Sequence, residues 1–127
     1  MDKAAVDRWL KAYVEAWKTN DREQIAALFA DDVKYRYNPY IDPVEGREAV
    51  VRSWLGEGDE PGTYDATYRA VAVDGQIAVA TGSSIYYREP GGPVDRQFYN
   101  CFVMRFDEGG RCAEFTEWFM ERPSTRS

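Results

Sequence analysis

A single carboxylate stands among aromatic side chains near the end of the sequence. In EFTEWFMERP, residues 114–123, Glu117 lies between Phe115 and Phe119 and directly before Trp118. A carboxyl group in an apolar pocket holds its proton more tightly than in water, which raises its pKa and suits it to general acid–base catalysis. The alternatives are a solvent-facing position on a strand, or a structural carboxylate bound to an amide, a tyrosine or an arginine. Whether Glu117 lies on the inward or the outward face of the strand helps to decide among these roles.

The rest of the sequence narrows the possible chemistry. The chain has no histidine, so the commonest neutral-pH base and the commonest zinc ligand are both absent. Asp31 and Asp32 are adjacent but have no third ligand at suitable spacing, and we predict no metal site. Cys101 and Cys112 lack a histidine to activate them as nucleophiles. No glycine-rich stretch leads into a helix with a following lysine, so no phosphate loop is predicted, and we expect no cofactor.

Composition places these residues in an ordinary globular protein. A length of 127 residues predicts one domain, which we assign to residues 1–123, with a loose C-terminal tail at 124–127. The net charge of -6, without a run of basic residues, argues against nucleic acid or an anionic membrane surface as a partner. The sequence MDKAAVDRWLKAY has no apolar segment of signal-peptide length. We therefore expect a cytoplasmic protein.

Helical periodicity dominates the first half of the chain. Apolar residues at spacings of three and one, from Val6 to Trp17, predict a helix over residues 3–18. Asp21 and Gln24 resemble a capping box and predict a second, short helix that ends near residues 31–32. The alternating stretch VKYRYNPY, from residue 33, predicts a strand ended by its proline. A third helix is predicted over residues 45–56.

Strand periodicity takes over from residue 64. Alternation predicts four antiparallel strands over residues 64–73, 76–87, 96–106 and 111–120. The dipeptide at 74–75, Asp-Gly, predicts a tight hairpin, and DEGG at 107–110 predicts a second one. The predicted fold class is therefore α+β, with three N-terminal helices packed on one side of a curved, mostly antiparallel sheet.

The register of the second hairpin predicts which face of the sheet carries Glu117. If Phe106 and Arg111 close a four-residue turn, Phe98 lies opposite Phe119, Asn100 opposite Glu117, and Phe102 opposite Phe115. All six side chains then share one face of the sheet. The other face is also apolar, with Trp118 and Met120, and a sheet with two apolar faces must be covered twice. We expect helices on one face and a second copy of the chain on the other, forming a homodimer.

The same reasoning applies to the Asp-Gly hairpin and to the cysteines. Closure by Val73 and Gln76 predicts that Tyr68 lies opposite Thr81, on a face with small side chains that leave room for a pocket.

Cys101 and Cys112 are about 13 Å apart along the predicted ladder. Because a disulfide needs Cα atoms within about 7 Å, free thiols are predicted.

The order and spacing of these motifs resemble the nuclear transport factor 2-like superfamily, in its SnoaL-like branch. The similarity covers almost the whole chain, through WLKAYVEAW, DREQIAALFADDVKYRYNPY, PVEGREAVVRSW and VMRFDEGGRCAEFTEWF. The resemblance implies a cone-shaped α+β barrel, with an apolar cavity between the long helix and the concave face of the sheet. Members include ketosteroid isomerases, polyketide cyclases, dehydratases, epoxide hydrolases and non-catalytic binding proteins, so the fold alone does not assign a function.

Comparison with the ketosteroid isomerases shows which catalytic groups are kept. Tyr13 matches their oxyanion-binding tyrosine, whereas Asn38 stands nearest to their catalytic aspartate and Phe102 replaces their oxyanion-hole aspartic acid. Two of the three groups are lost, so isomerisation by that apparatus is not expected. The alignment also places Glu117 and Asn100 on the cavity side, in agreement with the hairpin register. Glu117 lies in a region comparable to the catalytic strand of the SnoaL-like cyclases.

Three functions fit these observations. The first is a cofactor-independent isomerase, cyclase or dehydratase that acts on a hydrophobic, carbonyl-bearing substrate, in which Glu117 moves the proton and Tyr13 or Asn100 stabilises the oxyanion. The second is a non-catalytic ligand-binding dimer, and the third is a protein-interaction module that uses the outer sheet face. For each catalytic candidate, Asn38 included, a structural role is the alternative. The predicted ligand-binding residues are Trp17, Tyr37, Trp54, Tyr68, Thr81, Phe98, Phe102, Phe115 and Phe119.

Overall fold

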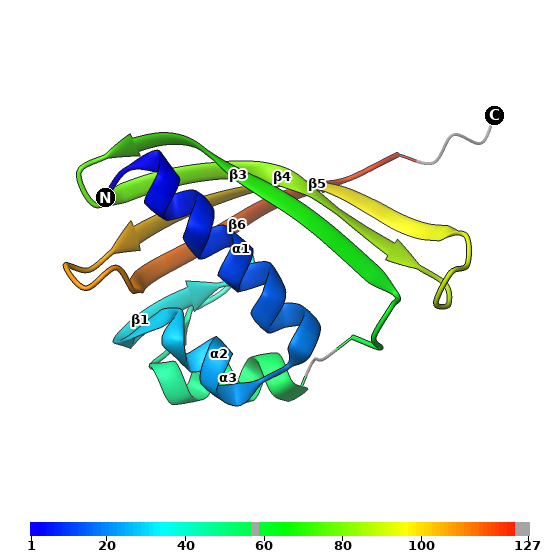
Figure 1. The fold of residues 1–127 in the computed structure, drawn as a ribbon, viewed down its shortest axis with the longest axis horizontal. Coiled ribbons are helices and arrows are strands. Elements are labelled where there is room, and N and C mark those ends of the chain that lie inside the picture. Colours follow the sequence, from blue (N-terminus) through cyan, green and yellow to red (C-terminus); the bar gives the residue numbers. More distant parts are fainter. Residues whose placement is uncertain (57–58, 124–127) are drawn as a thin grey trace.

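The computed structural model describes residues 1–56 and 59–123, which form three helices and one six-stranded sheet (Figure 1). The predicted α+β class is confirmed. The predicted tail at 124–127 and residues 57–58 of the predicted loop lie outside the described residues. Within the described residues, no helix is long and apolar enough to cross a membrane.

The helices begin where polar side chains can cap them. Helix α1 spans Lys3–Thr19, and the Asp2 side chain accepts a hydrogen bond from the Ala5 amide at 2.8 Å. Helix α2 spans Arg22–Ala27, and the Asp21 side chain accepts from the amides of Glu23 and Gln24. Helix α3 spans Arg47–Gly56. The first and third agree with the predicted helices, but α2 ends before residue 31, because the chain enters a strand at Phe29.

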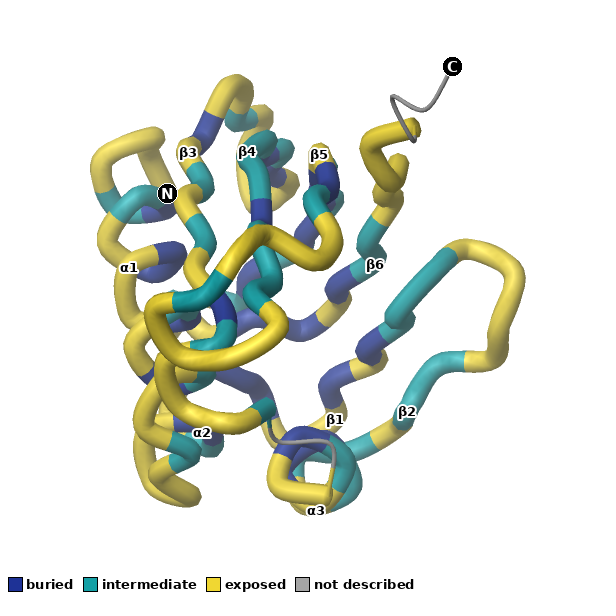
Figure 2. The backbone as a smooth tube through the Cα atoms, turned by 90° about the vertical axis from the view of Figure 1, so that its right-hand side faces the viewer, coloured by how far each residue is buried: buried dark blue, intermediate teal, exposed yellow. Residues whose placement is uncertain are grey.

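The sheet is mixed and open. Its strands are β1 (Phe29–Arg36), β2 (Val44–Glu45), β3 (Tyr64–Asp74), β4 (Ile77–Tyr87), β5 (Val94–Phe106) and β6 (Cys112–Glu121), in the order β2-β1-β6-β5-β4-β3. Strands β1 and β6 are parallel, whereas the other neighbours are antiparallel. The sheet curves around the helices as expected, and it is not closed, because β2 and β3 remain its two edges (Figure 2).

The β5–β6 register differs from the predicted one by two residues. Phe102 lies opposite Glu117 and Asn100 opposite Phe119, so the predicted direct pairs are wrong. The turn is one residue longer than predicted, since Phe106 pairs with Cys112, and a bulge before Phe106 adds a second residue. Because a shift of two restores the original alternation, the predicted inward face of this hairpin is unchanged.

The β3–β4 hairpin was also predicted in the wrong register, with a different consequence. Asp74 pairs with Ile77 at the turn, and a bulge at Val71 changes the register again between Ala70 and Ala72. Beyond the bulge Tyr68 lies opposite Gly82, while Thr81 lies opposite Arg69. The net shift is one residue, which places Thr81 on the face opposite to the one predicted.

The buried residues lie between the helices and the concave face of the sheet (Figure 2). Aliphatic and aromatic side chains together form this core. Trp9 donates its indole N–H to the Leu28 carbonyl at 3.0 Å, so the polar atom of this buried ring is satisfied. At the edge of the sheet, the Asp7 carboxylate of α1 accepts from the Ala70 amide at 2.8 Å, next to the β3 bulge. Cys101 and Cys112 are free thiols, as predicted.

Candidate functional site

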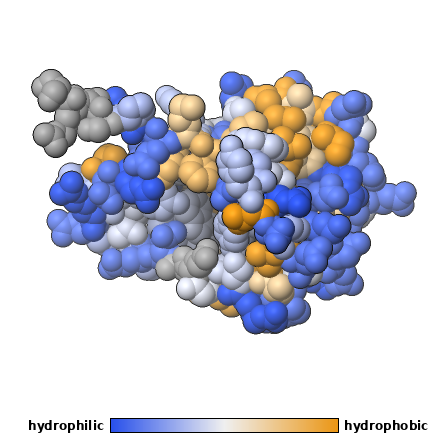
Figure 3. All heavy atoms as spheres, turned by 180° about the vertical axis from the view of Figure 1, so that it is seen from behind, coloured by the Kyte–Doolittle hydropathy of each residue, from blue (hydrophilic) through white to orange (hydrophobic). Residues whose placement is uncertain are grey.

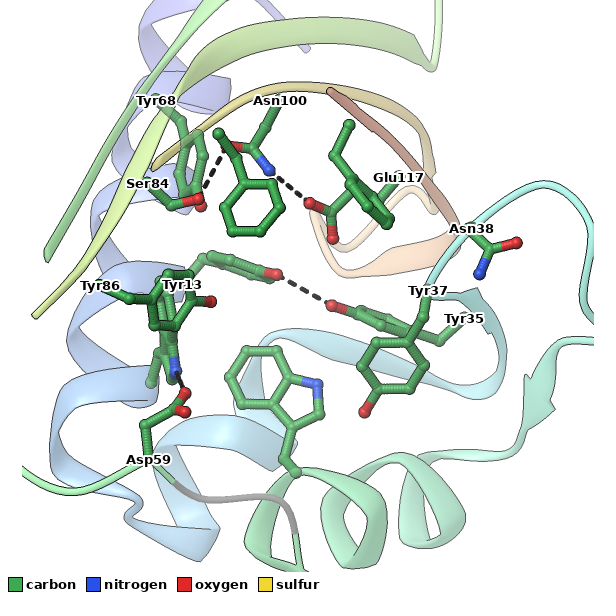
Figure 4. A pocket seen from close by; sticks show the side chains of 14 residues that line it. Tyr13, Tyr35, Tyr37, Asn38, Asp59, Tyr68, Ser84, Tyr86, Asn100 and Glu117 are labelled. Atoms are coloured by element: carbon green, nitrogen blue, oxygen red, sulfur yellow. Dashed lines mark hydrogen bonds between the residues drawn. The ribbon is translucent and has the colours of Figure 1, made fainter. Parts of the chain in front are cut away.

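A cavity of about 410 Å³ opens between α1, α3 and the concave face of the sheet. Figure 4 shows the side chains around it, and most of them are aromatic. The polar groups of the lining include five tyrosine hydroxyls, two carboxyl groups, two amides and one serine hydroxyl. Aromatic walls with convergent polar groups suit a small-molecule site. The lining residues are Tyr13, Trp17, Tyr35, Tyr37, Asn38, Trp54, Asp59, Tyr68, Ser84, Tyr86, Phe98, Asn100, Glu117 and Phe119.

Glu117 reaches this cavity from β6 and is fixed by an amide. Asn100, on the neighbouring strand β5, donates its side-chain N–H to Glu117 Oε2 at 2.5 Å. The Ser84 hydroxyl, on β4, donates to Asn100 Oδ1 at 3.0 Å. Since the amide oxygen is occupied by Ser84, the amide nitrogen faces Glu117. Apart from the aromatic residues and Cys112, Ser84 and Asn100 are the only two buried polar residues in the described part of the chain, and together they orient one carboxyl group.

Burial sets the proton affinity of this carboxyl group. Desolvation raises the pKa of Glu117 from 4.5 to about 7, and the hydrogen bond from Asn100 opposes the rise. Tyr13, Tyr35, Tyr68 and Tyr86 face the same carboxyl group from α1, β1, β3 and β4, and its negative charge raises their pKa values further. Glu117 therefore exchanges its proton near neutral pH, which suits a general acid or base.

The phenol groups of Tyr13 and Tyr35 meet at the wall of the cavity. The hydroxyls of Tyr13 and Tyr35 are 2.9 Å apart (Figure 4). Burial raises both pKa values, so both groups remain protonated at neutral pH. One hydrogen bond between two hydroxyls uses one proton, and the second O–H can donate to a ligand oxygen. The Tyr13 ring is held by Phe115, which stacks on it at 5.6 Å, and by Trp54, which meets it edge-on.

A second carboxylate lies at the other side of the cavity. Trp17 donates its indole N–H to Asp59 Oδ2 at 3.2 Å (Figure 4). The Trp17 ring is 6.1 Å from the ring of Tyr86, whose pKa is raised to about 12 by burial first and by Asp59 next. Within the described residues, no three Asp, Glu or Cys side chains lie close enough to hold a metal ion.

The structure brings most of the predicted site residues to this one cavity. All four predicted catalytic residues, Glu117, Tyr13, Asn100 and Asn38, line it, although Asn38 also caps a turn by accepting from the Tyr40 amide at 2.9 Å. Six of the predicted ligand-binding residues line it as well, namely Trp17, Tyr37, Trp54, Tyr68, Phe98 and Phe119.

Three predicted ligand-binding residues lie elsewhere. Phe102 and Phe115 are 1% and 0% exposed and belong to the core beneath Tyr13. Thr81 is on the outer face of the sheet, because the β3 bulge reverses its side. None of the three lines the cavity.

Sequence reasoning missed Tyr35, Asp59, Ser84 and Tyr86, which also line the cavity. Tyr35 could have been found, since it lies two residues from Tyr37 and therefore on the same face of the predicted strand. Ser84 and Tyr86 required the correct hairpin register. Asp59 follows a stretch without periodicity, and no local signal placed it.

The outer face of the sheet carries a second, shallower depression. Its lining includes Thr81, Tyr99, Cys101, Trp118 and Met120. Tyr99 is 75% exposed, Trp118 45% and Met120 72%. Figure 3 shows the side of the molecule that faces away from α1, where hydrophobic residues form patches among hydrophilic ones. This surface has no cover within the described chain.

Solved structures share this architecture at low sequence identity. A putative ketosteroid isomerase from Kribbella flavida has a TM-score of 0.69 and 21% identity, covering 99% of this chain and 85% of its own. A LEH-like epoxide hydrolase from M. tuberculosis has a TM-score of 0.68 and 19% identity, covering 93% and 84%. An NTF-2 like protein of unknown function from Burkholderia xenovorans has a TM-score of 0.72 and 18% identity, covering 97% and 88%. At such identities the likeness concerns the fold.

The sequence itself carries the family assignment. No curated protein matches it significantly. A family model described as the SnoaL-like domain matches residues 10–115, which run from the second half of α1 through β5 to the start of β6 and end two residues before Glu117. The chain therefore belongs to the SnoaL-like domain family.

Proposed function

We propose that this protein is a cofactor-independent isomerase or lyase that moves a proton on a hydrophobic, carbonyl-bearing substrate, with Glu117 as the acid–base group. One observation carries the proposal. Glu117 is held by Asn100 in a cavity with aromatic walls, and burial brings its pKa to about 7, where a carboxyl group both accepts and returns a proton readily.

The arrangement supports a two-step proton transfer. Ionised Glu117 removes a proton from the carbon next to the carbonyl group. The electron pair of the broken C–H bond forms a carbon–carbon double bond, and the π electron pair of the carbonyl group moves onto its oxygen. The free O–H of the Tyr13 and Tyr35 pair donates to the developing oxyanion. The oxyanion then reforms the carbonyl group while protonated Glu117 returns the proton. Transfer to the far carbon of a conjugated enolate completes an isomerisation, whereas transfer to a β-hydroxyl group, whose C–O bond breaks to release water, completes a dehydration. Asn100 holds the carboxyl group through both steps.

The experiment measures proton exchange on a simple ketone. The protein and 4-tert-butylacetophenone are mixed in deuterated buffer, and NMR follows deuterium entering the methyl group next to the carbonyl. We expect exchange to accelerate as pH rises through about 7, because Glu117 must be ionised to accept the proton. Glu117→Gln should lower the rate by about 100-fold or more. Glu108→Gln is the matched control, since Glu108 is exposed in a turn.

The competing function is ligand binding without catalysis. It predicts that the ketone binds but exchanges no faster than in buffer alone, or that Glu117→Gln leaves the rate and its pH dependence unchanged. Either result would end the catalytic proposal and leave the cavity as a binding site.

We also propose that the protein is a homodimer whose two subunits meet at the outer face of the sheet. Support comes from the exposed apolar side chains of β5 and β6, Tyr99, Trp118 and Met120. Burying large apolar side chains between two copies is favourable. The cytoplasmic location stays a prediction from the sequence.

A further inference from the structure

The electrostatic character of the cavity separates possible ligands by charge. Two carboxyl groups, Asp59 and Glu117, line it. Among the residues that the structure describes, neither lysine nor arginine lines it, and the chain has no histidine. A negatively charged ligand would meet two acids without a counter-charge, whereas a positively charged one would find partners for its charge.

The aromatic walls favour the same sign of charge. Ring faces carry partial negative charge and attract organic cations. Tyr13, Trp17, Tyr68 and Tyr86 present rings to the cavity from three different elements. One ring of the wall already holds a cation, since the Arg96 guanidinium lies 4.9 Å from the centre of the Phe98 ring.

Arg96 does not neutralise the cavity. It is not a lining residue, its side chain is about half exposed, and it pairs with Glu121 at 3.0 Å. Lys18, beside Trp17 in the sequence, pairs with Asp65 at 3.0 Å. The two neighbouring cations are therefore already matched by carboxylates outside the cavity.

Asp59 marks where a cation would bind. The indole N–H of Trp17 holds its carboxylate beside the Trp17 and Tyr86 rings. In Figure 4, Asp59 and Glu117 lie on opposite sides of the cavity, with aromatic side chains between them. A molecule spanning the cavity can therefore place one end against Asp59 and the other against Glu117.

We propose that the ligand is an organic cation, an amine or quaternary ammonium compound with a hydrophobic body, whose charged group binds between the Asp59 carboxylate and the rings of Trp17 and Tyr86. The inference rests on the proposed function only in that it places the reacting carbonyl at the Glu117 end. The charge preference itself is a property of binding and holds with or without turnover.

The test compares three ketones of similar shape. The cation 4-acetyl-N,N,N-trimethylanilinium and the neutral 4-tert-butylacetophenone differ by a nitrogen in place of a carbon, and 4-acetylbenzoate carries the opposite charge. Isothermal titration calorimetry at neutral pH should give the cation about tenfold higher affinity than its neutral counterpart. The benzoate should bind more weakly than both.

Two variants locate the cation. Asp59→Asn removes the charge but keeps an oxygen that can accept from Trp17. It should lower the affinity for the cation severalfold, toward that of the neutral ketone, and leave the affinity for the neutral ketone unchanged. Glu60→Gln removes the same charge from the adjacent exposed residue, which does not line the cavity, and should change the cation affinity less than about twofold.

Equal affinity for the cation and the neutral ketone, or an equal loss of both in Asp59→Asn, would overturn the inference. The outcomes also separate it from the proposed function. Preferential cation binding without deuterium exchange supports the inference and ends the catalytic proposal. Deuterium exchange into the neutral ketone without any charge preference in binding supports the catalytic proposal and overturns the inference.

Discussion

The chemistry of the candidate site depends on one carboxyl group and the residues that orient it. Glu117 receives a hydrogen bond from Asn100, and Asn100 is fixed in turn by Ser84. Each of the three comes from a different strand, so that no single segment holds the group in place. Burial is the larger influence on its pKa, and the Asn100 bond is the smaller one.

Burial of Glu117 predicts a pH-dependent stability. The pKa of Glu117 is raised in the folded state from 4.5 to about 7, so the folded protein binds this proton more tightly than the unfolded chain does. The stabilisation that proton binding gives is therefore lost as pH rises from about 4.5 to about 7. At about 1.4 kcal/mol for each pKa unit, and allowing for partial contact with solvent, Glu117→Gln should gain on the order of 2 kcal/mol relative to the wild type between pH 5 and pH 8. Urea unfolding at both pH values measures it. A difference that does not vary with pH would contradict the buried, protonated carboxyl group.

The Tyr13 hydroxyl is predicted to act on the reaction more than on binding. Tyr13→Phe removes one hydroxyl of the pair with Tyr35 and keeps the ring packing. If Tyr13 supports the oxyanion, ketone exchange should fall about 10- to 100-fold. The affinity for the neutral ketone should change little. Calorimetry and exchange on the same variant separate the two, and an unchanged exchange rate would assign Tyr13 to the core.

The register of the strands decides which side chains face the cavity. The two hairpins show the effect of a shift of one or two residues in the pairing. In β5–β6, a longer turn and a bulge together shift the pairing by two residues, which returns Glu117 to the predicted face. In β3–β4, the bulge at Val71 leaves a shift of one, which moves Thr81 to the outer face and brings Gly82 next to Tyr68. The sequence shows alternation clearly but contains no comparable signal for a bulge.

Gly82 is predicted to be required at its position on β4. A Cβ atom there would lie 2.0 Å from the Thr67 carbonyl oxygen and 2.5 Å from the Tyr68 ring. Gly82→Ala should therefore displace the strand or the Tyr68 wall and lower the free energy of unfolding by about 3 kcal/mol. Gly56→Ala is the control, because nothing lies within 4 Å of its Cβ, and it should be neutral within about 0.5 kcal/mol or slightly stabilising. Equal stability of the two variants in urea unfolding would contradict the close approach.

At the scale of the whole molecule, the two faces of the sheet have different tasks. Part of the concave face packs directly against α1. Another part is separated from the helix by the cavity, because Tyr68 and the small residues beside it do not fill the space. The outer face keeps large apolar side chains in solvent. Such a surface on a small domain is typical of a protein interface.

The proposed dimer predicts a specific sensitivity at Trp118. Light scattering should give the wild type twice the mass of one chain. Trp118→Glu places a charge in the outer face and should yield monomers at micromolar concentration. Tyr40→Glu is the control, since Tyr40 is 98% exposed on a loop distant in sequence from that face, and it should leave the dimer intact. A wild-type monomer, or a Trp118→Glu dimer, would contradict the proposal.

The sequence by itself determined the fold class, the long first helix, the strand alternation and the inward side of Glu117, because these follow from local periodicity and capping. Only the tertiary structure decided which side chains surround Glu117. The parallel pairing of β1 with β6 brings Tyr35 beside Tyr13, although 22 residues separate them. The bulge decides the side of Thr81, and the tertiary fold places the Asp59 carboxylate at hydrogen-bond distance from Trp17, 42 residues away. Contacts between distant segments arise from the packing of the whole chain, which no local pattern encodes.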